Sequence, residues 1–84
     1  MYEIIIEKKA DKYLSTIPSE YQERIRGKID ELANNPFPKG AKKLKKDDDK
    51  FSLRTGPYRI VYKIIKEELL ILVVKIGHRK DIYN

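Results

Sequence analysis

Basic and hydroxyl side chains alternate along two adjacent stretches in the second half of the chain. Lys50, Ser52 and Arg54 are spaced two apart, and Arg59 follows in a second alternating run that begins at Tyr58. Side chains of a strand point alternately to its two faces, so residues two apart share a face. If the apolar rows of both runs face the core, these four polar side chains project together from the open face. A surface of this kind attracts anions, although an ordinary solvated sheet face has the same pattern.

Further polar groups follow the last apolar run of the chain. The segment from Gly77 to Tyr83 contains His78, Arg79, Lys80 and the phenol of Tyr83. His78 is the only histidine, which excludes a two-histidine mechanism within one chain. A lone histidine is either a general acid or base or a packed turn residue, and the sequence leaves both open. The chain has no cysteine, which excludes disulfides and zinc–thiolate sites and fits a reducing compartment.

The segment from Phe37 to Lys50 is the most highly charged part of the sequence and is predicted to be a loop. Four lysines surround Leu44, namely Lys42, Lys43, Lys45 and Lys46. They form a candidate phosphate-contacting patch, or else a common lysine-rich surface loop. Three consecutive aspartates, Asp47 to Asp49, follow. Sequence neighbours cannot all point at one ion, and calcium-loop spacing is missing, so a solvated turn is expected and no metal site.

Length and charge define the general class of protein. Eighty-four residues make one domain, residues 1–84, with a small core. Residues 1–35 hold six Lys/Arg against seven Asp/Glu, a net −1, whereas residues 36–84 hold thirteen against six, a net +7. Such a one-sided positive field favours nucleic acid over acidic proteins or anionic lipids. No signal peptide and no apolar run long enough for a bilayer is present, so a cytoplasmic protein without a membrane partner is expected.

Hydrophobic periodicity predicts the elements that must position these groups. A strand is expected at Tyr2–Glu7, with Ile4 and Ile6 on one face and Glu3, Ile5 and Glu7 on the other. A helix over Lys8–Ile17 carries an apolar stripe, and Pro18 ends it. A second helix begins at Ser19, which forms a capping-box pattern with Gln22, and stops at Asn34-Asn35-Pro36. The two helices form a hairpin that covers one face of the sheet.

Three strands are predicted to complete the chain as a meander. They are Phe51–Arg54, Tyr58–Ile65 and Leu69–Ile76, separated by turns at Thr55-Gly56-Pro57 and Lys66-Glu67-Glu68. The last run is nearly all apolar, which predicts a central strand covered on both faces and the most buried of the three. The expected fold class is therefore α+β, in the order β-α-α-β-β-β.

The ordered set of motifs resembles the RelE/ParE superfamily of toxins from type II toxin–antitoxin systems, in its RelE-like branch. The resemblance rests on Leu53-Arg54, on Tyr58-Arg59-Ile60-Val61-Tyr62, on the acidic turn, and on Val73 through Tyr83. The helical hairpin and Lys42-Lys43-Leu44 extend it over the whole chain. It implies an antiparallel-dominated twisted sheet of the microbial-ribonuclease-like kind with the hairpin on one face.

Members of the RelE-like branch are ribosome-dependent endoribonucleases, and the resemblance implies that activity here. The ribose 2′-oxygen attacks the adjacent phosphate of mRNA in the ribosomal A site, without a metal or other cofactor, and translation stops. The implied partners are the ribosome, mRNA and a RelB-like antitoxin that neutralises the toxin.

The resemblance also implies roles for individual residues. Arg59 and Arg79 match the family's two catalytic arginines, Tyr83 matches its terminal tyrosine, and Lys50 matches the first of two alternating lysines. His78 is a tentative acid or base. RNA and phosphate contacts are expected from Arg54, Lys42, Lys43, Lys45, Lys46 and Lys80.

Ser52 departs from the family pattern, because it stands where the second alternating lysine is usual. The loss of one cation would weaken activation of the 2′-oxygen, since acid–base groups contribute roughly 10²–10⁴-fold each. Two alternatives therefore stay open. One is a ParE-like inhibitor of DNA gyrase, which has the same fold but acts by binding a protein. The other is a weakly catalytic relative that binds RNA or the ribosome.

Overall fold

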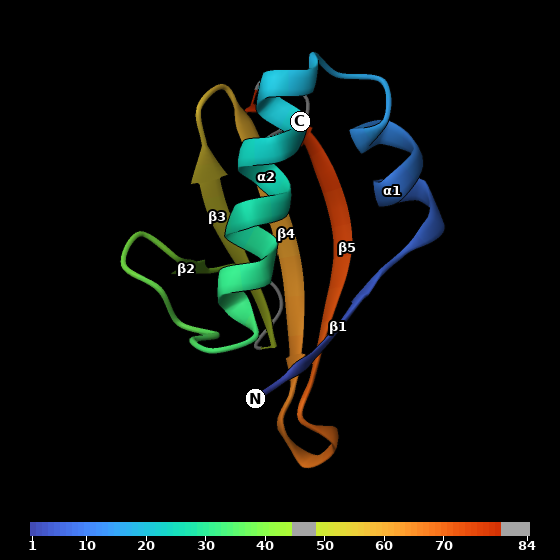
Figure 1. Ribbon diagram of the computed structural model, residues 1–84. Coiled ribbons are helices and arrows are strands. Elements are labelled where there is room, and N and C mark those ends of the chain that lie inside the picture. The colour runs from blue at the N-terminus through green and yellow to red at the C-terminus, as the bar shows by residue number, and fades with distance from the viewer. Residues whose placement is uncertain (45–48, 80–84) are drawn as a thin grey trace.

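The computed structural model describes residues 1–44 and 49–79 (Figure 1). Two helices follow the first strand, and four strands complete the described chain. The elements in order are β1 (Glu3–Ile6), α1 (Lys8–Leu14), α2 (Ser19–Leu32), β2 (Lys42–Lys43), β3 (Lys50–Thr55), β4 (Tyr58–Ile65), the 3₁₀ turn η1 (Lys66–Glu68) and β5 (Leu70–His78). The predicted α+β order is confirmed. The two-residue strand β2 is an addition, inside the segment that was predicted to be a loop.

The strands form one mixed sheet in the order β1-β5-β4-β3-β2. The meander from β3 to β5 is antiparallel, while β1 pairs in parallel with β5, from Glu3 opposite Leu70 to Ile6 opposite Val73. A parallel pair needs a long crossover, and here α1, α2 and the meander supply it. The β4–β5 register is interrupted by a bulge beside Val61 and Tyr62.

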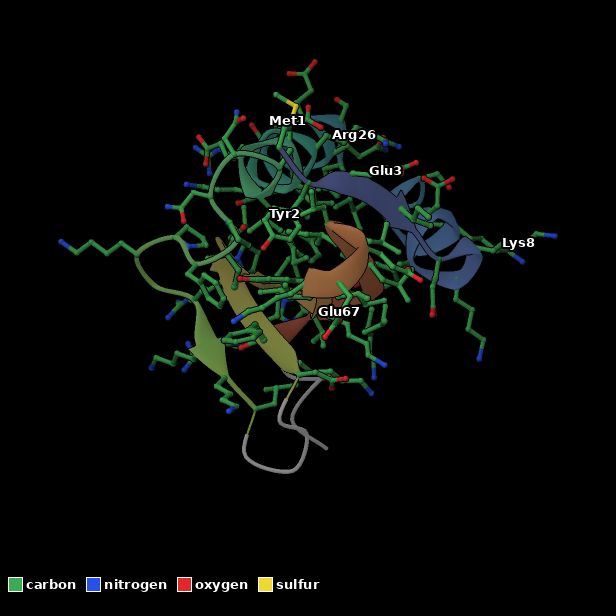
Figure 2. The ribbon with its side chains drawn as sticks, turned by 90° about the horizontal axis from the view of Figure 1, so that it is seen from below. Met1, Tyr2, Glu3, Lys8, Arg26 and Glu67 are labelled. Atoms are coloured by element: carbon green, nitrogen blue, oxygen red, sulfur yellow. The ribbon has the colours of Figure 1, made fainter. Side chains whose placement is uncertain are left out.

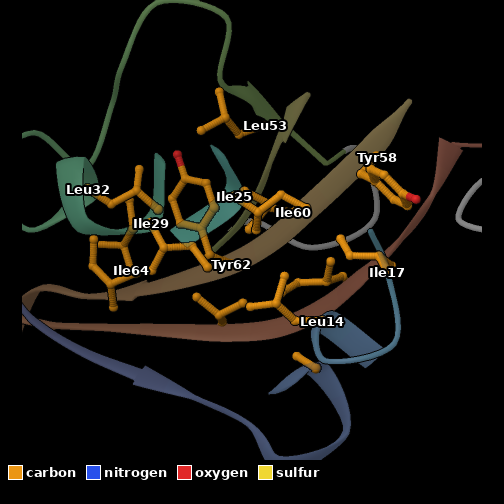
Figure 3. Close-up of a cluster of buried hydrophobic side chains, with 14 residues drawn as sticks. Leu14, Ile17, Ile25, Ile29, Leu32, Leu53, Tyr58, Ile60, Tyr62 and Ile64 are labelled. Atoms are coloured by element: carbon orange, nitrogen blue, oxygen red, sulfur yellow. The ribbon is translucent and has the colours of Figure 1, made fainter. Parts of the chain in front are cut away.

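Both helices pack on the same face of the sheet, which leaves the other face without a helical cover. Figure 2, which looks along the molecule from below, shows α1 and α2 on one side of the strands. Their apolar stripes meet Ile60, Tyr62, Ile71 and Val73 of the sheet, all of which are completely buried (Figure 3). Each such side chain contributes roughly 1.5–3 kcal/mol when it leaves water. This core fixes which strand residues face away from the helices.

The predicted helical hairpin is confirmed, with two local corrections. α1 ends at Leu14 rather than at Ile17, although Ile17 is still buried in the core. The predicted capping box is wrong: Pro18 occupies the N-cap position of α2, and no side chain caps it. The Nε2 of Gln22 instead donates to the carbonyl oxygen of Ile17 at 2.9 Å, which joins α2 to the connection before it.

The last strand differs from its prediction. β5 extends to His78, because Gly77 and His78 pair with Arg59 and Tyr58 of β4. It is covered mainly on one face: Ile71, Val73 and Ile76 are buried, whereas the residues of the other face, apart from Gly77, are half-buried or exposed. β4 is the most buried strand, with six of its eight residues buried. The prediction that this strand is covered on both faces and is the most buried is therefore wrong, because an apolar run does not by itself require burial of both faces.

The turn between β3 and β4 depends on Gly56. Thr55 pairs directly with Tyr58, so only Gly56 and Pro57 make the connection. Gly56 has a φ of +59°, and a Cβ at this position would lie 3.0 Å from Cε1 of Tyr21 on α2. Glycine therefore allows both the left-handed backbone and the close approach of the helix. Across the described residues, no helix is long and apolar enough to cross a membrane.

Candidate active site

The face of the sheet that carries no helix is strongly basic; we call it the open face. Cross-strand partners share a face, so the register assigns its members. On the side of β2, β3 and β4 they include Lys42, Lys50, Ser52, Arg54, Arg59, Val61, Lys63 and also Lys75 of β5, six of which are cations. Toward β1 the same register places Ile65, Leu70 and Leu72 on this face, together with Glu3 and Ile5. The predicted grouping of Lys50, Ser52, Arg54 and Arg59 on one face is confirmed, but the prediction that all four project from it is wrong, because Ser52 and Arg59 are buried.

Arg59 is held in place beneath this surface. Its side chain is only 7% exposed, and Ser52 beside it is 3% exposed. The guanidinium Nη1 donates to the Ser52 hydroxyl at 3.3 Å, across the diagonal between β3 and β4. Burying a charged group is costly unless hydrogen bonds compensate. The hydroxyl therefore supplies an acceptor that orients the planar donor fork.

Arg54 and Arg59 form a directly opposed pair of like charges. They are cross-strand partners on β3 and β4, and Arg54 is exposed while Arg59 is buried. The Nε of Arg54 donates to the carbonyl oxygen of Gly56 at 3.3 Å, which draws its side chain toward the turn. Like charges placed opposite each other destabilise a sheet. An anion bound between the two guanidinium groups would remove that repulsion.

A second like-charge pair lies further along the same strands. Lys50 is opposite Lys63, and the Lys63 ammonium contacts the Asp49 carboxylate at 3.2 Å. Lys63 is four residues from Arg59 on β4, which corresponds to roughly 13 Å along the strand. The basic surface thus continues from the arginine pair to the start of β3.

His78 ends β5 and Arg79 follows it, but the two residues differ in their environment. The backbone N–H of Arg79 donates to the carbonyl oxygen of Pro57 at 2.8 Å, and its side chain is exposed. His78 is the cross-strand partner of Tyr58, and the two rings are arranged edge-on with their centroids 5.7 Å apart. Tyr58 belongs to the core between sheet and helices, so His78 faces away from Arg59. This geometry matches the packed residue rather than the acid or base.

The remaining predicted site residues are only partly described. Lys42 and Lys43 are exposed on β2, with Lys42 on the open face opposite Ser52 and Lys43 on the other face opposite Phe51. Lys45, Lys46, Lys80 and Tyr83 lie outside the described residues. Asp49 is exposed at the turn before β3, while Asp47 and Asp48 lie outside the described part. No cluster of three potential metal ligands exists within residues 1–44 and 49–79.

A family model for the ParE toxin of the type II toxin–antitoxin system parDE matches residues 4–83. The chain belongs to the RelE/ParE family of toxins. The resemblance seen in the sequence is thereby confirmed.

Two relatives with sequences similar to this chain are named as RelE toxins. A RelE-like toxin protein of Escherichia coli is 33% identical, over 99% of this chain and 90% of the relative. The mRNA interferase toxin RelE of Escherichia coli strain K12 is 30% identical, also over 99% of this chain and 90% of the relative. Within the family, the chain is thus a RelE-like toxin.

The solved RelE structures confirm the fold. The archaeal RelE–RelB complex of Pyrococcus horikoshii OT3 contains a chain that is 26% identical, with a TM-score of 0.84 over 93% of this chain and 94% of that one. Two helices on one face of a sheet are therefore the family architecture, and the open face lies on the opposite side.

Sequence reasoning overlooked two cations of this RelE-like surface. Lys63 and Lys75 lie on the open face but were not among the predicted site residues. The signal for Lys63 was present, since it has the same parity as Arg59 on one strand. The signal for Lys75 was hidden by the bulge, which changes the alternation between β4 and β5.

Proposed function

We propose that this RelE-family toxin is a ribosome-dependent, metal-independent endoribonuclease that cleaves mRNA in the ribosomal A site and thereby inhibits translation. The observation that carries the proposal is the buried, hydrogen-bonded Arg59 on a face with five other cations. A guanidinium fork matches the oxygens of a phosphate, and pre-organised donors stabilise charge that develops in the transition state.

The proposed reaction needs only groups of the RNA and the protein. The 2′-oxygen forms a bond to phosphorus, and the bond from phosphorus to the 5′-oxygen breaks, which leaves a cyclic phosphate and a 5′-hydroxyl. One proton leaves the 2′-hydroxyl, and one reaches the departing 5′-oxygen. Arg59 stabilises the phosphorane charge, and Arg79 either shares that role or gives the proton to the leaving oxygen.

Lys50 is the proposed base, because it shares the open face with Arg59, whereas His78 packs on Tyr58. Tyr83 is proposed to stack on a base of the mRNA. Ser52 changes from a missing cation to a positioning residue, since its hydroxyl orients the Arg59 fork.

An antitoxin partner is part of the same proposal. The solved relative from Pyrococcus horikoshii is a RelE–RelB complex. A basic open face with the half-buried apolar residues of β5 beside it suits an acidic, partly disordered RelB-like chain that folds on binding. Such a partner would block access to Arg59. Co-expression with the neighbouring reading frame and co-purification would identify it, and a complex that still cleaves mRNA would contradict the neutralising role.

Primer extension on an mRNA, with and without programmed ribosomes, tests the proposed activity. New 5′ ends inside decoded codons, seen only with ribosomes, are expected. Cuts on naked RNA would keep the nuclease and discard its dependence on ribosomes. Intact mRNA from a folded sample would overturn the nuclease, and DNA damage together with growth arrest would indicate gyrase inhibition instead.

A further inference from the structure

A separate cavity of about 550 Å³ lies where β3 begins, beside the end of β4. Phe37 from the loop after α2, Phe51 from β3, and Lys43, Lys63 and Lys66 contribute to its walls. The turn at Glu67, labelled in Figure 2, lines one side of it. None of these residues belongs to the site around Arg59 except Lys63, which the two regions share. The cavity has the size of a small-ligand site.

An aromatic ring is presented at this cavity in a fixed position. Phe37 is 48% exposed, so about half of its side chain is accessible to a ligand. The Phe37 and Phe51 rings meet in an edge-on arrangement with their centroids 5.3 Å apart, and the Phe51 and Tyr62 rings stack with their centroids 5.9 Å apart. The Asn35 side chain accepts a hydrogen bond from the Phe37 N–H at 3.1 Å, and the Tyr62 hydroxyl donates to the Pro36 carbonyl at 2.9 Å. The loop is therefore anchored on its N-terminal side, and the ring needs little reorganisation to bind a partner.

Charges around the ring favour an anion over a neutral ligand. The Lys66 ammonium lies 5.7 Å from the centroid of the Phe37 ring. Among the described residues, three lysines and the two carboxylates of Asp49 and Glu67 line the cavity, a net charge of +1. One of these carboxylates, Asp49, is already engaged by Lys63. An aromatic face beside ammonium groups is the combination that binds a base together with its phosphate.

We propose that this cavity binds one nucleotide of a single-stranded RNA, with the base stacked on Phe37 and the phosphate held by Lys43 and Lys66. The inference rests on RNA being the substrate in the proposed function. Lys63, opposite Lys50, joins the cavity to the open face, and the Arg59 rung lies roughly 13 Å away along β4. The bound nucleotide is therefore not the one that is cleaved. It lies a short way along the same strand and sets how the RNA crosses the sheet.

Adenosine 5′-monophosphate and inorganic phosphate are the first probes. Their binding is measured through the amide chemical shifts of the full chain. The nucleotide should shift Phe37, Phe51 and Lys66 in a saturable way, and inorganic phosphate should bind at least about tenfold more weakly because it lacks a base. The same shifts should persist in Arg59→Ala, since that residue is not in the cavity. Equal binding of both probes would discard base stacking, and unchanged amides at these residues would overturn the site.

Binding of a short 2′-O-methylated RNA, which cannot undergo 2′-attack, provides the second test by fluorescence anisotropy. Phe37→Leu should weaken binding roughly tenfold, while Phe37→Tyr keeps it, because only the latter retains an aromatic face. Leu69→Ala is the matched control: Leu69 is 54% exposed and does not line the cavity. Wild-type affinity in Phe37→Leu would overturn the proposal.

A charge variant keeps the proposal testable if the Phe37 variant does not fold. Lys66→Ala should reduce the magnitude of the slope of log K for RNA binding against log[salt] by about one. Lys12→Ala, on the exposed surface of α1, should leave this slope unchanged. Equal slopes in both would count against the phosphate contact. A chain that binds RNA through Phe37 but never cleaves it would keep this site and remove the nuclease, so the two failures are distinguishable.

Discussion

The Ser52 hydroxyl accepts a hydrogen bond from the Arg59 guanidinium at 3.3 Å, and both residues are buried. They lie diagonally across β3 and β4, so Ser52 contacts the arginine that is proposed to be catalytic. A hydroxyl here accepts one hydrogen bond from a buried cation, whereas a second ammonium would repel it. The predictions that follow concern this pair, its surroundings and the packing that supports them.

Ser52→Ala should slow cleavage by roughly 10–100-fold, because a hydrogen bond to a charged group contributes about 1.5–3 kcal/mol. Single-turnover cleavage of ribosome-bound mRNA measures this rate. Ser52→Thr retains a hydroxyl and should restore most of the activity. Ser15→Ala, which removes an exposed hydroxyl on another part of the chain, is the control. A wild-type rate in Ser52→Ala would show that Arg59 does not depend on this acceptor.

Arg59→Ala should reduce cleavage by about 10²–10³-fold, since it removes a pre-organised donor to the transition state. Arg79→Ala should have a comparable effect. Circular dichroism and thermal unfolding should show an intact fold, because Arg59→Ala also removes the repulsion from Arg54. Arg26→Ala serves as control, since its contact with Asp11 is exposed. Full activity in the folded Arg59→Ala, Arg79→Ala double variant would reject the assignment of both arginines.

His78→Gln should leave the cleavage rate within about threefold of wild type, because the ring packs on Tyr58 and faces away from Arg59. Acid–base groups typically contribute roughly 10²–10⁴-fold, so the two cases separate clearly. The pH–rate profile between pH 5 and 8 is the decisive measurement. If His78→Gln removes a rise or fall of the cleavage rate in the pH range where imidazole titrates, His78 takes part in proton transfer.

Alkali should destabilise the protein through Tyr62. Burial raises the pKa of Tyr62 from 10.0 to about 12. The native state therefore keeps this proton between pH 10 and 12 while the unfolded state loses it, so stability is fully present below pH 10 and falls as pH rises toward 12. The loss from this one group amounts to roughly 2–3 kcal/mol.

Urea unfolding of wild type and Tyr62→Phe at several pH values measures that contribution. Tyr62→Phe should flatten the decline above pH 10, at a cost of about 1 kcal/mol at neutral pH for the lost hydrogen bond to Pro36. Tyr21→Phe, which changes a half-buried tyrosine, should leave the slope unchanged. Parallel curves for wild type and Tyr62→Phe would refute the assignment.

Two glycine substitutions should have opposite effects. Gly56→Ala should cost at least about 1–2 kcal/mol, because its φ is +59° and the new Cβ would crowd Tyr21. Gly27→Ala should stabilise by up to about 1 kcal/mol, since it lies within α2 and nothing lies within 4 Å of the added carbon. Calorimetric Tm values for both variants decide this. A rise in Tm for Gly56→Ala would show that the turn relaxes freely.

Much of this architecture is determined by local sequence pattern. The helical spacing of Ala10 and Leu14 and the alternation of Tyr58 through Ile65 predict the right elements and the right buried faces. The same parity places Lys50, Ser52, Arg54 and Arg59 on one surface. These features follow from the geometry of a single helix or strand, which neighbouring residues define by themselves.

Tertiary structure decided which residues of different strands and helices contact one another. The parallel pairing of β1 with β5, the diagonal contact of Ser52 with Arg59, and the packing of His78 against Tyr58 all join residues from different elements. The cavity beneath Phe37 likewise needs a loop, a strand start and a strand end to meet. Strand register and helix placement result from the free energy of the whole core, so no local pattern encodes these contacts. For this reason the sequence determined the chemistry available to the open face, and only the folded chain decided which groups share it.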